Sequence, residues 1–181
     1  LLPGFQDAHI HPISAGVEAS SCDLNGLTTV DEYIAAIKKY ADGHPDEAWI
    51  TGVGWLMSAF GPGALTSRKL IDAVVPDRPV LLWSTDGHTT WANSKALELA
   101  GITNETPDPP DGRIDRDSHG IAIGSLQEGA SSLVTVVIIA ASVFLPQGPG
   151  FVGTWQAGCV LALFEILHAP HDVAVGYSLL T

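Results

Sequence analysis

The chain has 181 residues, enough for one domain that buries a substantial core. It carries 20 Asp and Glu against 8 Lys and Arg, a net charge of -12, and this acidic balance argues against a nucleic-acid partner, whose phosphates need clustered cations. Its two cysteines, Cys22 and Cys159, form no CxxC pair, so we expect neither a disulfide framework nor a zinc knuckle and predict a cytoplasmic protein.

The first predicted element is a buried strand over residues 2–10. It carries Asp7 and His9 at alternate positions, and His11 follows before Pro12. Residues i and i+2 of a strand point to the same side, so the two imidazoles would face one direction, as ligands of a divalent metal such as zinc can. The alternative is that both histidines face solvent or bind only backbone groups.

A helix and a strand follow. The segment TTVDEYIAAIKKYADGHP predicts a helix in which Thr29 is the cap and Glu32 completes a capping box, and which Gly43 and Pro45 end. The run AWITGVGW, which begins at Ala48, has the apolar character of a strand.

The same alternation continues along the chain. LTSRKLIDAVVP predicts a helix that begins with a cap at Thr66, PVLLWS a strand, and NSKALELAG a helix with Ser94 as its cap and Gly101 just past its end. After the turn-rich PDPPDG loop, GRIDRDSHGIAIGSL predicts a hairpin that turns at residues 117–120. Alternating strands and helices indicate an α/β fold.

Several blocks of this region resemble one known family. PGFQDAHIHP is similar to the first barrel strand of the amidohydrolase superfamily, and the blocks from CDLNGL to GSLQEGA resemble the N-terminal half of amidohydrolase family 3, the N-substituted formamide deformylase-like proteins. The resemblance covers about residues 1–133. It implies part of a (β/α)8 metal-dependent hydrolase barrel, since a whole barrel takes about 250 residues.

The resemblance also implies a reaction. His9 and His11 would bind zinc or a similar divalent ion, which would polarise a carbonyl and make hydroxide available near neutral pH. The reaction would be hydrolysis of an amide, or of a related lactone or ester, in a small-molecule substrate. Asp7 would fix a histidine tautomer or the turn after the strand.

Two further residues are candidates for catalysis. His88, in STDGHTTWANS, follows a predicted strand and could line a substrate pocket with Trp91 and Asn93, or could be a loop histidine beside a helix cap. Glu128, in GSLQEGA, matches a carboxylate position of the family block, which could reach the metal, and it could equally be an exposed glutamate at a helix start. His119 is expected to be a residue of the hairpin turn.

The last part of the chain differs in composition. No charged residue occurs between Gly129 and Phe164, and the segment around LPQGPGFVGTWQAG resembles a membrane segment of the flippase-like region of lysylphosphatidylglycerol synthases. We therefore predict two regions of different origin, 1–133 and a hydrophobic helical tail over 134–181, in a chimeric sequence. Residues 134–164 would either contact a membrane or form core helices.

Three hypotheses for function follow. The first is a metal-dependent hydrolase, incomplete or rebuilt, that takes its remaining ligands from His88, His119 or Glu128, or from His168 and His171. The second is a non-catalytic membrane-associated or binding fragment, and the third is a recombined reading frame with a different hydrolytic site. Because half a barrel leaves an apolar face open, we expect the tail to cover that face or the chain to form a homo-oligomer.

Overall fold

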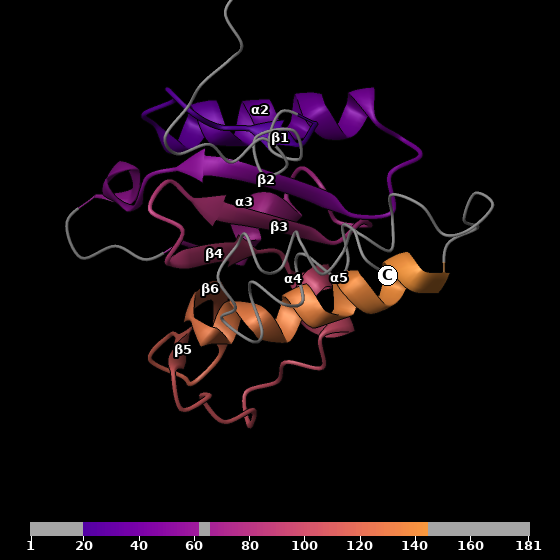
Figure 1. The fold of residues 1–181 in the computed structure, drawn as a ribbon. Coiled ribbons are helices and arrows are strands. Elements are labelled where there is room, and N and C mark those ends of the chain that lie inside the picture. Colours follow the sequence, from indigo (N-terminus) through magenta and orange to yellow (C-terminus); the bar gives the residue numbers. More distant parts are fainter. Residues whose placement is uncertain (1–19, 62–65, 145–181) are drawn as a thin grey trace, which may run out of the picture.

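The computed structural model describes residues 20–61 and 66–144. The predicted strand with Asp7, His9 and His11, and the tail beyond residue 144, lie outside these ranges. The described residues form one six-stranded sheet in the order β1-β2-β3-β4-β6-β5, with α2 at the β1–β2 end and α5 at the β4–β6 end (Figure 1).

The elements have the following bounds. The strands are β1 (Cys22–Asp23), β2 (Ile50–Trp55), β3 (Val80–Ser84), β4 (Thr89–Ala92), β5 (Gly112–Arg116) and β6 (Ala122–Glu128). The helices are α2 (Val30–Gly43), α3 (Arg68–Asp72), α4 (Ser94–Leu99) and α5 (Ser132–Phe144), and two short 3-10 turns are η1 (Met57–Phe60) and η2 (Gly129–Ser131).

The sheet has a parallel half and an antiparallel half. β1, β2 and β3 are parallel, and α2 and α3 make the crossovers between them. β3 then turns back into β4, and the β4–β6 and β5–β6 pairs are also antiparallel. A (β/α)8 barrel consists of parallel strands, so the described residues confirm the α/β class and do not confirm a barrel fragment.

α2 begins as predicted, and a side chain that is distant in the sequence binds the carbonyls at its C-terminal end. The Thr29 hydroxyl accepts from the Glu32 N–H at 3.3 Å, and the Glu32 carboxylate accepts from the Thr29 N–H at 3.0 Å, which is the expected capping box. At the other end, the Arg78 guanidinium donates to the carbonyls of Ala41 and His44. These bonds satisfy carbonyls that a helix end leaves without partners.

Two predicted helix caps are wrong by one residue. Asn93, and not Ser94, caps α4, because its side-chain oxygen accepts from the Ala96 N–H at 3.0 Å. Ser67, and not Thr66, is the extended residue before α3, and it makes no side-chain capping bond. The predicted glycine past α4 is confirmed, since Gly101 has a φ of 66°.

The hairpin between β5 and β6 turns where the sequence predicts. The Gly120 N–H donates to the Asp117 carbonyl at 3.0 Å, and the Asp117 carboxylate accepts from the N–H groups of His119 and Ile121. His119 is therefore a residue of the turn, as expected.

Two core clusters lie on opposite faces of the sheet. Leu82 and Trp91 belong to the cluster that α2 and α3 cover, whereas Leu81 belongs to the cluster beside α4 and α5. Neighbouring residues of a strand point to opposite faces, so the apolar run of β3 is buried on both sides. Val134 is fully buried in the second cluster, and Ile138 packs against it.

α5 therefore runs across the predicted boundary between residues 133 and 134. Its first turns pack on the sheet, whereas the rest of the predicted tail lies outside the described residues, so its covering role stays a prediction. Among the described residues, we find no helix with both the length and the apolar composition needed to cross a bilayer.

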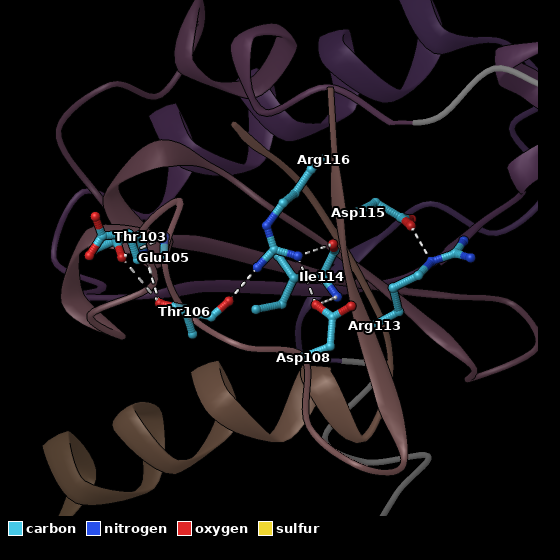
Figure 2. Close-up of polar contacts among 8 residues, drawn as sticks. All are labelled: Thr103, Glu105, Thr106, Asp108, Arg113, Ile114, Asp115 and Arg116. Atoms are coloured by element: carbon cyan, nitrogen blue, oxygen red, sulfur yellow. Dashed lines mark hydrogen bonds and ion pairs between the residues drawn. The ribbon is translucent and has the colours of Figure 1, made fainter. Parts of the chain in front are cut away.

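The side chains of Asp108, from the preceding loop, and of Arg116, at the end of β5, occupy the outer edge of β5 (Figure 2). The Ile114 N–H donates to Asp108 at 3.1 Å, and the Ile114 carbonyl accepts from Arg116 at 2.9 Å. Arg116 also contacts the Asp108 carboxylate at 2.7 Å and the Thr106 carbonyl at 2.5 Å. These contacts satisfy edge groups that would otherwise be open to another strand.

Candidate active-site edge

His88 and Glu128 meet at one edge of the sheet. His88 lies in the turn before β4, and Glu128 is the last residue of β6, which pairs antiparallel with β4 so that Thr89 lies opposite Gln127. The His88 Nδ1 atom is 3.1 Å from Glu128 Oε1 and 3.2 Å from Oε2, and the Glu128 N–H donates to the His88 carbonyl at 2.8 Å. The fold thus joins two residues that are 40 positions apart.

This edge also holds the carboxyl ends of the parallel strands. β2 ends at Trp55, whose carbonyl accepts from the N–H of Thr85, just past the end of β3, at 2.9 Å. Ligands of open α/β sheets bind outside the carboxyl ends of the strands. The side chains of His88 and Glu128 are 67% and 57% exposed, so both are accessible from solvent there.

The acidic neighbours of His88 favour its charged form. The hydrogen bond that His88 donates to Glu128, and then the charge of Glu128, raise the pKa of His88, and the charge of Asp86 adds a smaller effect in the same direction. Asp86 accepts from the Ser84 hydroxyl at 2.6 Å and from the His88 N–H at 3.1 Å, and these two bonds lower the pKa of Asp86. The surroundings of His88 therefore favour its protonated, charged form.

The backbone of Glu128 is strained. It is the one non-glycine residue in the described ranges with a positive φ, at 50° with ψ at -130°. Such conformations cost about 1–3 kcal/mol and persist where the surroundings fix them. Here the Glu128 N–H is bound to His88, and the next N–H, of Gly129, donates to the Asp111 carbonyl at 3.2 Å.

Trp91 and Asn93 do not line a pocket with His88, so that prediction is wrong. Both are fully buried. Trp91 packs edge to face against Trp55 and Phe60, and Asn93 caps α4.

The described residues do not complete a metal site. Within residues 20–61 and 66–144, no group of three His, Cys, Asp or Glu side chains is placed to hold a metal ion. His88 and Glu128 are two donors, whereas a catalytic zinc takes three protein ligands. The metal-ligand prediction for His9 and His11, and the supporting role predicted for Asp7, stay predictions because these residues lie outside the described ranges.

Two acidic residues near this edge are absent from the sequence-based candidates. Asp86 lies two residues before His88, a spacing at which an aspartate commonly binds the backbone of a turn, and this signal could have found it. Asp115 is buried in β5 and binds Ser125 and Gln127 of β6. Its partners lie 10 and 12 residues further along the chain, and only the pairing of β5 with β6 brings them to Asp115.

Comparison with known proteins identifies the family. Residues 1–143 match the model of the amidohydrolase family, so the chain belongs to that family. The match extends ten residues past the predicted limit at residue 133 and includes nearly all of α5. The comparisons do not support a membrane flippase segment, and they do not confirm a chimeric sequence.

Curated relatives share the same part of the chain. The Protein LONG AFTER FAR-RED 3 of Arabidopsis thaliana is 38% identical over 135 residues, which are 75% of this chain and 23% of that protein. The N-substituted formamide deformylase of Arthrobacter pascens is 35% identical over 136 residues, which are 74% of this chain and 25% of that enzyme. The chain thus spans about a quarter of the length of these relatives.

A solved structure has a similar fold. An uncharacterized metal-dependent hydrolase from Pyrococcus horikoshii OT3 superimposes with a TM-score of 0.54 at 25% identity, over 90% of this chain and 28% of that one. This neighbour supports the α/β fold described above.

Proposed function

We propose that this chain is part of a metal-dependent hydrolase that cleaves the C–N bond of a small amide. The observation that carries the proposal is the family match over residues 1–143, because it includes both the HxH run and the edge where His88 meets Glu128. The relative named N-substituted formamide deformylase supports an amide over a lactone or ester.

His9 and His11 are the proposed metal ligands, with zinc as the proposed ion and Asp7 orienting one of the imidazoles. A bound divalent ion supplies a polarised carbonyl and a hydroxide nucleophile near neutral pH. The His88 imidazole and the Glu128 carboxylate bind each other, so we give this pair a task other than metal binding.

The proposed task of His88 is to donate a proton to the departing amine. An amine leaves an amide readily only when its nitrogen is protonated, and Glu128 raises the pKa of His88, which favours the protonated imidazole that can supply this proton. Because Glu128 engages Nδ1, the Nε2 atom is the one that faces the substrate in this proposal. Glu128 keeps the imidazole charged and oriented.

Metal content tests the proposal. The purified chain is loaded with zinc, dialysed and analysed for bound metal beside His9→Ala, His11→Ala and the control His44→Ala. His44 stacks on Tyr40 with ring centroids 4.0 Å apart and has no proposed role at the site. We expect the parent and the control to retain more zinc than the other two variants. Equal zinc in all four, or none in the parent, would contradict the proposal.

Hydrolysis of formanilide, a simple N-substituted formamide, tests the chemistry. Release of aniline should stop when a chelator is added and return when zinc is restored. His88→Ala should lower the rate without lowering the zinc content, since His88 is not a proposed ligand. If His88→Ala also lowers the zinc content, the proposal that His88 donates a proton and does not bind the metal is contradicted.

A further inference from the structure

A buried carboxylate lies next to the strand end that carries Glu128. Asp115, in β5, is 3% exposed. Its Oδ2 atom accepts from the Ser125 hydroxyl and from the Gln127 amide, each at 2.7 Å, and its Oδ1 atom accepts from Arg113 Nε at 2.8 Å. Figure 2 shows the Arg113 contact on β5. Asp115 therefore ties three side chains of two neighbouring strands together.

The hairpin also has backbone pairing and apolar contacts that do not involve this charge. Ile114 lies opposite Leu126 in the backbone ladder, and both are buried on the other face of the sheet. A buried carboxylate is costly unless hydrogen bonds compensate it, and replacing such a polar network with apolar residues is often neutral for stability. The network thus calls for an explanation other than stability.

Its position supplies that explanation. Gln127, which Asp115 holds, directly precedes Glu128. Glu128 has the strained backbone described above, and strained residues keep their conformation only where neighbours determine it. His88 and Asp111 fix the N–H groups of Glu128 and Gly129, and Asp115 fixes the residue before them.

We propose that Asp115 is a positioning residue: through Gln127 it holds the end of β6 so that the Glu128 carboxylate meets the His88 imidazole. The geometric part of this proposal stands apart from the proposed hydrolase activity, and only its consequence for catalysis rests on that activity. Asp115 touches neither His88 nor substrate, and its effect passes through the strand end.

The test uses the His88 pKa, measured by NMR in the folded chain, because that value depends on the contact with Glu128. Two variants weaken the network in different ways. Asp115→Asn removes the charge, and Gln127→Met removes the amide that links Asp115 to the strand end. Ile114→Val is the matched control, since it loosens the same hairpin from its other face.

We expect the His88 pKa to fall toward its ordinary value in Asp115→Asn and in Gln127→Met, and to stay at the parent value in Ile114→Val. An unchanged pKa in Gln127→Met overturns the proposal even if Asp115→Asn fails to fold. An equal fall in Ile114→Val also overturns it, because general loosening would then account for the effect.

Formanilide hydrolysis separates this proposal from the one before it. Where both hold, Asp115→Asn lowers kcat with little change in KM, and Gln127→Met follows it. If the pKa falls while the rate is unchanged, the positioning of Glu128 is upheld and the proton-donor role of His88 is rejected.

Discussion

The parallel and antiparallel halves of the sheet are stabilised in different ways. Around β1, β2 and β3, large apolar and aromatic side chains pack with few buried polar groups, and Trp55 lies at their centre. Around β4, β6 and β5, buried polar groups bind one another, such as Thr90 to Ser131 at 3.1 Å and Asp115 to Ser125. The half that carries His88 and Glu128 thus has more hydrogen bonds between buried side chains than the parallel half.

Trp55→Ala tests the apolar half and should have the largest effect. Trp55 is fully buried, packs against Phe60 and Trp91, and donates its indole N–H to the Leu82 carbonyl at 2.9 Å. Removing it should lower the free energy of unfolding by about 3–5 kcal/mol, as measured by denaturant titration. The control is Leu99→Ala, at an exposed position. If Trp55→Ala lowers the free energy of unfolding no more than Leu99→Ala does, the contrast between the two halves is refuted.

Asn93→Ala tests the buried hydrogen bonds by which Asn93 links β3 to α4. The Asn93 side chain accepts from the N–H groups of Val80 and Ala96 and donates to the carbonyls of Val75 and Arg78. Its loss leaves buried groups without partners, so we expect about 2–3 kcal/mol of destabilisation in the same titration. Asn93→Ser keeps a capping oxygen and should cost less. Equal costs would show that the cap contributes nothing.

Glu128→Gly tests whether the positive φ of Glu128, at the candidate site, lowers the stability of the protein. Glycine adopts a positive φ without a steric penalty, so the variant should be more stable by about 1 kcal/mol, seen as a higher Tm. Glu98→Gly, in the regular helix α4, should instead be destabilising. A lower Tm in Glu128→Gly would mean that the contact with His88 outweighs the strain.

Glu128→Gln has the smallest expected effect on stability and the clearest spectroscopic one. The pKa of His88 should fall toward its ordinary value when the carboxylate is lost. In the parent, a raised pKa stabilises the fold at pH values below the ordinary imidazole pKa, and this contribution is lost as the pH rises through the raised value. Glu98→Gln, which removes the partner of Lys95, should leave the His88 titration unchanged.

Features that depend on neighbouring residues could be predicted from the sequence. The capping box of α2 involves residues three apart, and the turn at residues 117–120 depends on Asp117 and Gly120. The Asn93 cap was misplaced by one residue because Asn and Ser are both good caps, and only the contact with Val80 decides between them.

Features that depend on strand order could not be predicted. β4 pairs with β6 after the chain has passed through α4 and β5, and this pairing brings His88 to Glu128. The hairpin between β3 and β4 also changes the sheet from parallel to antiparallel, whereas alternating elements predict parallel strands throughout. Both candidate residues could be named from the sequence, but their contact could not.

The cover on the outer edge of β5 bears on how the protein behaves in concentrated and acidic solution. Asp108 and Arg116 occupy the hydrogen-bonding groups of Ile114 that could otherwise template a strand of a second molecule and start a fibre. The bond from Arg116, and then that from Ile114, lower the pKa of Asp108. Protonation of Asp108, as the pH falls through its lowered pKa, weakens its contacts with Arg116 and Ile114, so we expect more association of molecules through this edge in acid than in neutral solution.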